Sequence, residues 1–162
     1  MSQVKPIPEG FHTLTPHIVV KDAAKAIEFY KEAFGAEEIC RMPGPGGQGV
    51  MHAEIKIGDS MVMMCDEFPQ TPHFKSPESL NGTTNKLTLY VTDCDKVFNQ
   101  AVASGATAEM PPTDMFWGDR YGTLVDPFGH EWAVATHKED LTPEDIGKRA
   151  AEFFSSQSGC SG

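Results

Sequence analysis

The fold of this chain is decided by residues 117–132, which read WGDRYGTLVDPFGHEW. Two runs of alternating residues surround Asp126-Pro127-Phe128-Gly129. Proline is favoured at the second position of a tight turn, and glycine supplies the positive φ needed near its end. The stretch therefore predicts a β-hairpin, with a further strand over residues 131–136. The flanking aromatic residues are Phe116, Trp117, Tyr121, Phe128 and Trp132, which are typical of a packed apolar cluster.

Composition limits the possible partners. A chain of 162 residues forms one domain, or two small modules that share a core. The net charge of −10 argues against nucleic acid and anionic membranes, and no apolar run is long enough to cross a bilayer. The first ten residues lack the apolar segment of a secretory signal. The four cysteines are widely spaced, without a Cys-x-x-Cys pair, and this predicts free thiols in the cytoplasm.

The first half of the chain predicts a β-α-β-β-β unit. Asp22 is placed to cap a helix over residues 23–34, and Gly35 to end it. In residues 50–57, one face carries His52, Glu54 and Lys56, and the apolar residues occupy the other. The expected strands are residues 13–20, 37–42, 50–57 and 60–65, with a glycine-rich loop at 43–49.

The same pattern returns after residue 85. The two halves align at an offset of about 70 residues, which sets Asp22 against Asp93. The second set comprises strand 86–91, a helix capped by Asp93 or Asp95 and ended by Gly105, strand 107–110, a Pro111-Pro112 loop and the opening hairpin. We therefore expect an α+β fold in which two paired βαβββ modules form a curved mixed sheet around a central cleft.

The domain boundaries follow from this repeat. We expect an N-terminal extension (1–11), a two-module domain (12–140), a C-terminal helix (141–155) and a disordered tail (156–162). The modules span residues 12–66 and 86–137, joined by a loop at 67–85. The C-terminal helix has an apolar stripe that includes Phe153 and Phe154, so it should dock on its own sheet or on a second subunit.

Three segments carry a family resemblance. They are TPHIVVKD (15–22), VMHAE (50–54) and FWGDRYG (116–122), alongside the Asp126-Pro127-Phe128-Gly129 turn. The chain resembles the vicinal oxygen chelate superfamily, in particular its PhnB-like branch, over about residues 12–140. That superfamily includes glyoxalases, extradiol dioxygenases and bleomycin- or fosfomycin-resistance proteins. The resemblance implies the paired-module fold and a homodimer, but it does not settle activity, because one fold hosts many chemistries.

Metal-using members of this superfamily take ligands, usually His or Glu, from the first and last strand of each unit. By resemblance, those four places fall on Thr15, Met64, Lys86 and Ala133. A slip of one residue brings in Cys65 and Leu87, which does not restore a His/Glu set. Such residues do not suit a divalent metal, so we expect no standard metal site and no cofactor.

A non-standard site stays open as an alternative. Alternation along their strands would turn His17, His52 and Glu54 toward the cleft, and Glu131 and His137 share the parity of Ala133. Together these side chains could bind a divalent metal. His52 and Glu54 could instead form a catalytic acid–base pair, or simply a solvated, hydrogen-bonded face.

The remaining candidate residues describe an apolar ligand site. Met64 is expected to point into the cleft beside Tyr90, Phe116 and Trp117, forming a floor for a planar or hydrophobic ligand. Arg120 could recognise a carboxylate or phosphate, or form a surface pair with Asp119 or Asp126. With His17, these residues are the candidate ligand-binding set.

Three functions are consistent with the sequence. The preferred one is a glyoxalase/bleomycin-resistance-like protein that binds a small aromatic or hydrophobic molecule without a metal. The second is a metal-dependent enzyme of lyase, isomerase or dioxygenase type with non-standard ligands. The third is a non-catalytic dimeric scaffold.

Overall fold

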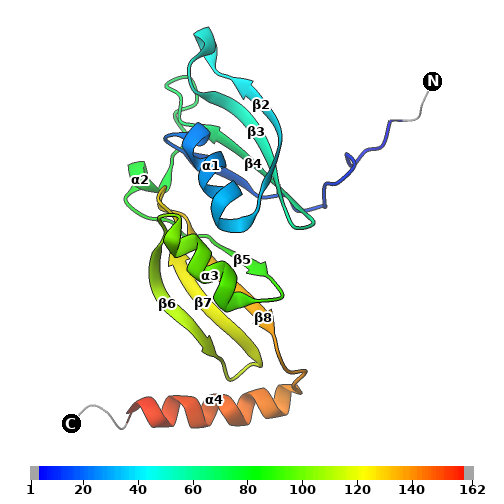
Figure 1. Cartoon of the computed structure of the whole chain (residues 1–162), viewed down its shortest axis with the longest axis vertical. Helices are drawn as coiled ribbons and strands as arrows, with labels where there is room; N and C mark the ends of the chain where they lie inside the picture. The colour runs from blue at the N-terminus through cyan, green and yellow to red at the C-terminus, as the bar shows by residue number, and fades with distance from the viewer. Residues whose placement is uncertain (1–3, 159–162) are drawn as a thin grey trace.

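The computed structural model describes residues 4–158, which form two modules of the same design (Figure 1). Each module contributes a mixed four-stranded sheet in which only the first and last strands pair in parallel. The elements of the first module are β1 (His17–Val20), α1 (Ala23–Phe34), β2 (Glu37–Pro43), β3 (Val50–Ile57) and β4 (Ser60–Asp66). Those of the second are β5 (Lys86–Tyr90), α3 (Cys94–Ala103), β6 (Thr107–Asp114), β7 (Asp119–Val125) and β8 (Glu131–His137).

We name the two sheets A and B. Sheet A has the strand order β1-β4-β3-β2, and sheet B has the order β5-β8-β7-β6. Three further elements lie outside the sheets: a short 3-10 helix (Pro45–Gly47), α2 (Pro77–Leu80) and α4 (Pro143–Ser158). The predicted α+β fold of two βαβββ modules with a C-terminal helix is confirmed.

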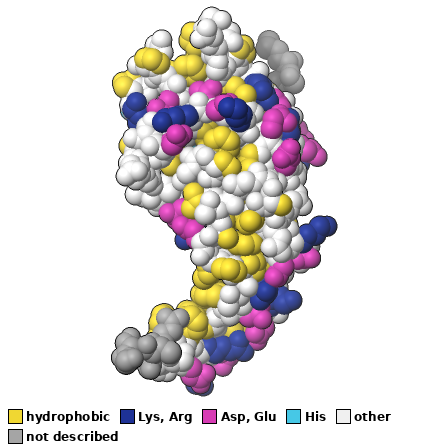
Figure 2. All heavy atoms as spheres, turned by 60° about the vertical axis from the view of Figure 1, so that its left-hand side comes forward, with side chains coloured by type: hydrophobic (Ala, Val, Ile, Leu, Met, Phe, Trp, Pro, Cys, Tyr) yellow, Lys and Arg dark blue, Asp and Glu magenta, His cyan; other side chains and the backbone are white. Residues whose placement is uncertain are grey.

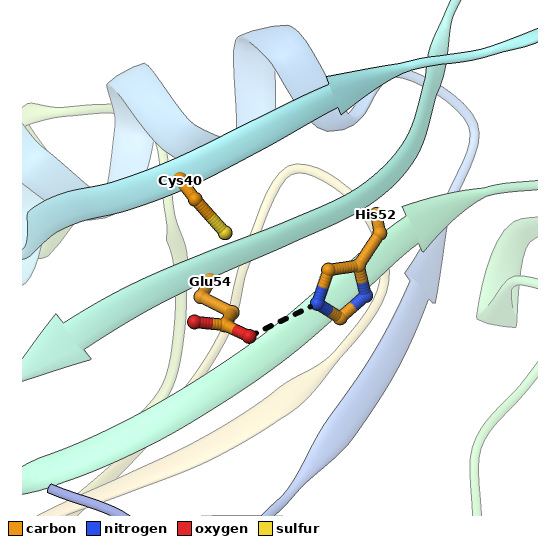
Figure 3. A group of neighbouring side chains, drawn as sticks. All are labelled: Cys40, His52 and Glu54. Atoms are coloured by element: carbon orange, nitrogen blue, oxygen red, sulfur yellow. Dashed lines mark hydrogen bonds and ion pairs between the residues drawn. The ribbon is translucent and has the colours of Figure 1, made fainter. Parts of the chain in front are cut away.

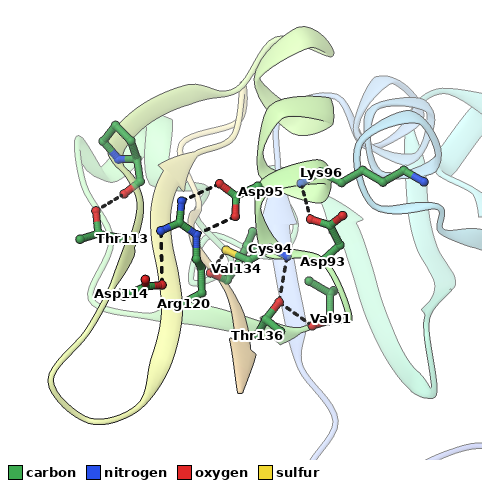
Figure 4. Close-up of polar contacts among 11 residues, drawn as sticks. Val91, Asp93, Cys94, Asp95, Lys96, Thr113, Asp114, Arg120, Val134 and Thr136 are labelled. Atoms are coloured by element: carbon green, nitrogen blue, oxygen red, sulfur yellow. Dashed lines mark hydrogen bonds and ion pairs between the residues drawn. The ribbon is translucent and has the colours of Figure 1, made fainter. Parts of the chain in front are cut away.

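The last strand of each module holds the start of that module's helix. In the first module, Asp66 accepts hydrogen bonds from the backbone N–H groups of Ala23 (2.7 Å) and Val50 (2.7 Å). In the second, the Thr136 hydroxyl accepts one from the N–H of Cys94 at 2.8 Å (Figure 4). The bonds to Ala23 and Cys94 satisfy N–H groups that a helix leaves unpaired at its first turn, and the bond to Val50 holds the start of β3 to the same carboxylate. The internal repeat therefore extends from sequence to hydrogen bonding.

The two modules share one core. Helices α1 and α3 lie side by side on the same side of the two sheets (Figure 1). The Tyr30 hydroxyl on α1 donates to Asp126 in the second module at 2.6 Å, and the Trp132 indole donates to the same carboxylate at 2.8 Å. The rings of Phe34 and Trp132 are 4.8 Å apart. The predicted aromatic hairpin thus splits: Trp132 and Phe128 enter this core, whereas Trp117 and Tyr121 do not.

Several predicted boundaries were wrong. Pro111 and Pro112 lie within β6 rather than in a loop, because β6 is an edge strand where a missing N–H is tolerated. Strand β1 starts at His17, not at residue 13. Residues 67–85 do lie between β4 and β5, and they include the short helix α2.

The C-terminal region also differs from its prediction. Helix α4 continues to Ser158, so the first three residues of the predicted disordered tail are helical, while residues 1–3 and 159–162 lie outside the described part. Thr142 caps α4 by accepting from the N–H of Asp145 at 3.2 Å. Within residues 4–158, no helix is long and apolar enough to cross a membrane.

Candidate functional site

Each sheet has one face against its helix, and we call the other its open face. Residues paired across neighbouring strands point to the same face. In sheet A, the row Ile18–Met64–Ala53 is buried against α1, whereas the row that contains His17, Met63 and Glu54 lies on the open face.

The prediction that Met64 points into the cleft is wrong, because its side chain is fully buried in the core. The Gly58-Asp59 turn pairs Ile57 with Ser60, and this register sets Met64 opposite Ala53. A shift of one residue moves every side chain of a strand to the opposite face. Met63, and not Met64, therefore contributes to the open face.

The donors at the four standard ligand places do not fit a divalent metal. Met64 is in the core, and Ala133 offers no donor atom. The Lys86 ammonium faces Glu131 at 3.7 Å, and the Thr15 hydroxyl donates to the carbonyl of His12. Only Thr15 supplies an oxygen, and a cation would be repelled by Lys86. We therefore derive no chemistry from a metal at these places.

The open face of sheet A instead brings together Cys40, His52 and Glu54 (Figure 3). Their potential ligand atoms all lie within 4.8 Å of one another, and His52 Nε2 is 3.2 Å from Glu54 Oε1. Partial loss of hydration, and then the nearby Glu54 charge, raise the pKa of the Cys40 thiol. We name these three residues the Cys40 cluster.

Of the other candidates for the non-standard site, His17 lies beside the Cys40 cluster and Glu131 does not. His17 contacts it edge-on, with its ring centroid 6.2 Å from that of His52. Glu131 belongs to the second module and is not part of the Cys40 cluster. His17 and Glu131 both line a pocket of about 710 Å³ where β1, β5 and the loop before β5 meet.

Sequence reasoning missed Cys40. Strand β2 has a register shift between Glu38 and Cys40, so simple alternation does not say where the thiol points. An irregularity of this kind re-aims a side chain. The shift pairs Cys40 directly with Glu54 and brings it to the open face.

The open face of sheet B carries an aromatic platform, which we define as Tyr90, Trp117 and Tyr121. Tyr90 and Tyr121 both pair with Ala135, so they flank this small residue on one face. The rings of Trp117 and Tyr121 are 5.4 Å apart in an edge-to-face arrangement. Tyr90 is 67% exposed. The platform therefore presents aromatic surface to solvent.

One buried carboxylate holds this platform in place. Asp119 is 4% exposed and accepts hydrogen bonds from the Tyr90 hydroxyl (2.9 Å) and the Trp117 indole (3.1 Å). His137 Nδ1 lies 2.8 Å from its other oxygen. These contacts fix the orientation of the Tyr90 and Trp117 rings. Trp117 is a near neighbour of Asp119 in the sequence, but Tyr90 lies 29 positions away. The sequence therefore did not indicate that Asp119 holds both rings.

The hydrogen bonds to Asp119 also control its ionisation. Burial alone would raise the pKa of the Asp119 carboxyl, but hydrogen bonds from His137, Tyr90 and Trp117 outweigh burial and lower it. The pKa of His137 is raised, first by its contact with Asp140 and then by Asp119. Both groups are therefore charged over a wider pH range than usual, and they support one another.

Of the remaining candidates, Phe116 lies beside the platform, whereas Arg120 lies on the helix-facing side of sheet B. The Phe116 ring is 4.9 Å from that of Trp117 and 5.5 Å from that of Phe153 on α4, so it links the platform to the C-terminal helix. The guanidinium of Arg120 is paired with aspartates other than the two that the sequence suggested. Its guanidinium makes two 2.7 Å bonds to Asp95 on α3 and a third contact to Asp114 (Figure 4). A bidentate pair of this kind leaves little capacity for a second anion.

Fold and site together define a paired-module protein with an open face on each sheet. The family described as "Glyoxalase/Bleomycin resistance protein/Dioxygenase superfamily" matches residues 10–134. The chain belongs to this superfamily, which is the vicinal oxygen chelate superfamily that its sequence resembles.

Three similar proteins illustrate the range of the match. An uncharacterized protein of Mycobacterium bovis, Mb0911c, is 44% identical over 135 residues, which is 82% of this chain and 88% of that protein. The structure of TioX from Micromonospora is 25% identical with a TM-score of 0.62, covering 78% of this chain and 98% of that one. A PhnB protein from Bacillus cereus, described as a putative 3-demethylubiquinone-9 3-methyltransferase, is 19% identical with a TM-score of 0.58. It covers 77% of this chain and 99% of that one, and it shares the fold, in agreement with the PhnB-like resemblance.

Proposed function

We propose that this chain binds a small planar aromatic molecule on the aromatic platform, without a metal ion at that place. The observation that carries this proposal is the single buried carboxylate, Asp119, that holds two aromatic rings of an exposed surface. Rings fixed in advance lose little conformational entropy when a ligand stacks on them, and this favours affinity.

The polar groups of the platform support binding rather than proton transfer. Asp119 already accepts from Tyr90 and Trp117 and faces His137. Both ring nitrogens of His137 are also engaged, one by Asp119 and the other by Asp140 at 3.0 Å. A general base needs a free lone pair within reach of the substrate proton. These groups therefore position the rings, and we assign them no catalytic step.

The charge of the protein limits the class of ligand expected at the aromatic platform. The chain has a net charge of −10, and aromatic faces attract cations. Arg120 points to the opposite, helix-facing side of sheet B, where Asp95 and Asp114 pair with its guanidinium, so it offers no positive charge to the platform. We therefore expect a neutral or cationic planar ligand in preference to an anionic one.

Tryptophan fluorescence tests this proposal, because the chain has two tryptophans and Trp132 is only 1% exposed. Titration with planar aromatic cations, including aromatic antibiotics, should quench Trp117 saturably. By calorimetry, Trp117→Ala should weaken binding by about 30-fold, in the range of a central aromatic contact. Phe74→Ala, an aromatic deletion in the loop that joins the modules, where the ring contacts His17, should leave the affinity unchanged. No saturable quenching by any member of the panel would contradict the proposal and favour the scaffold alternative.

We further propose that the protein is a cytoplasmic homodimer. Large apolar side chains are exposed on sheet A (Met42 and Met51) and on α4 (Phe154). Figure 2 shows hydrophobic side chains along the narrow part of one face, and a hollow between this part and the terminal helix. Exposed apolar surface of this kind is typical of an interface. The three described free thiols, Cys40, Cys65 and Cys94, support a reducing compartment.

Sedimentation equilibrium tests the dimer. The intact chain should sediment with twice its mass of 17.7 kDa, and a chain cut before residue 141 should shift toward monomer. A monomeric intact chain at micromolar concentration would contradict this proposal.

A further inference from the structure

We propose that the Cys40 cluster binds one divalent metal ion of intermediate softness, such as Zn²⁺, through Cys40 Sγ, His52 Nε2 and a Glu54 carboxylate oxygen. The Cys40 cluster lies on sheet A in the first module, whereas the aromatic platform lies on sheet B in the second. The inference is therefore independent of the proposed ligand site, and each can fail without the other.

The geometry places three donors at one point. Figure 3 shows the three side chains approaching one another from the neighbouring strands β2 and β3. His52 and Glu54 are two positions apart on one strand, so they share a face, and Cys40 pairs across from Glu54. The donor atoms lie within 4.8 Å of one another. With metal–ligand bonds of about 2.0–2.3 Å, tetrahedral coordination needs donors roughly 3–4 Å apart, which small side-chain rotations would supply.

The chemistry of the donors selects the metal. A thiolate, an imidazole and a carboxylate match the ligands of Zn²⁺ and disfavour Mg²⁺ and Ca²⁺, which take oxygen ligands. Three protein ligands leave a fourth position for water or another small molecule, as in catalytic rather than structural zinc sites. The half-buried side chains of His52 and Glu54, 30% and 22% exposed, leave room for such a molecule.

This site differs from the standard one of metal-using relatives. Those proteins take ligands from the first and last strands of each module, whereas the cluster uses β2 and β3 of a single module. A hydrogen-bonded His–Glu pair alone would be an ordinary surface feature. Such a pair does not require a nearby thiol, yet the register shift in β2 brings Cys40 to the same point. The third donor is what favours a metal site over an ordinary hydrogen-bonded pair.

Cobalt binding tests the site. Full-length protein, stripped with a chelator and kept reduced, is titrated with Co²⁺, whose absorption reports thiolate coordination by a charge-transfer band in the near ultraviolet. Calorimetry with Zn²⁺ gives stoichiometry and affinity. We expect one ion per chain and a thiolate band in the Co²⁺ form. Cys40→Ser should abolish the band, and Cys40→Ser and Glu54→Gln should each weaken Zn²⁺ binding by about 100-fold or more, at or above the usual effect of second-shell changes.

Two control variants make the test specific. His17→Gln removes an imidazole on the same face that is not among the three donors, and it should change Zn²⁺ affinity by less than about threefold, the size of an ordinary substitution outside the donor set. Trp117→Ala should leave the metal site intact while it weakens the aromatic ligand. Circular dichroism confirms that each variant is folded. Zn²⁺ binding that Cys40→Ser leaves unchanged, or that is substoichiometric in the intact protein, would overturn the assignment, and so would an equal loss in His17→Gln.

Discussion

Replacement of Asp126 by alanine is expected to lower the free energy of unfolding by about 4 kcal/mol, the largest effect we expect of any single substitution. Its Oδ1 accepts from the N–H groups of Phe128 and His130, both at 2.9 Å, and its Oδ2 accepts from Tyr30 and Trp132. Each buried donor that loses its acceptor costs about 1–3 kcal/mol, and relaxation recovers part of the sum. Because Tyr30 lies on α1, the substitution weakens both the hairpin turn and the contact between modules.

Urea denaturation measures this loss directly. The matched control is Asp114→Ala, since Asp114 is also an aspartate of the second module, but its side chain is 78% exposed and contacts Arg120. An exposed ion pair contributes little, so the control should change the free energy of unfolding by less than about 0.5 kcal/mol. Equal effects of the two substitutions would show that Asp126 does not join the modules.

Replacement of Asp119 by alanine is expected to weaken aromatic ligand binding by about 10- to 100-fold. The substitution releases the Tyr90 hydroxyl and the Trp117 indole, and each side chain that must be ordered on binding costs about 0.5–1.5 kcal/mol. Since 1.4 kcal/mol corresponds to tenfold in affinity, freeing two rings gives about this range. Calorimetry with the ligand found in the fluorescence titration measures it.

Two comparisons separate pre-organisation from unfolding. Tyr90→Phe removes one of the hydrogen bonds but keeps the ring, so it should weaken binding by only a few-fold, while circular dichroism checks the fold of both variants. The pKa of Asp119 is lowered, so its contribution should be complete at neutral pH and disappear only as the pH falls through that lowered value. If Asp119→Ala bound the ligand with unchanged affinity, binding would not require Asp119 to hold the Tyr90 and Trp117 rings in place.

The sequence predicted the features that depend on neighbouring residues. Asp22 caps α1 by accepting from the N–H of Lys25, and Gly35 ends the helix with a φ of 67°. The turn at residues 126–129 forms as expected, with Gly129 at a φ of 87°. These signals, repeated in both halves, were sufficient for the fold. Each is local, and the chain can adopt it without reference to distant residues.

The positions of the side chains at the candidate site were harder to predict, because they depend on how the strands pair. Strand β4 has apolar residues from Met61 to Cys65, so alternation could not separate its two faces, and the turn before it was the better guide. Cys40 required a register shift that no local pattern announces. Asp119 and Arg120 find partners on other elements, Tyr90 and Asp95. The aromatic character of the site could therefore be predicted, and the carboxylate that holds it could not.

The central claim is that the aromatic platform is the ligand site, and amide and indole NMR shifts test it most directly. Addition of a bound planar cation to isotopically labelled wild-type protein should shift the indole N–H signal of Trp117 and the backbone signals of Tyr90 and Tyr121. The indole signal of buried Trp132 should stay in place. Shifts confined to the junction pocket around Leu14, Leu80 and Leu87, with Trp117 unchanged, would contradict the claim.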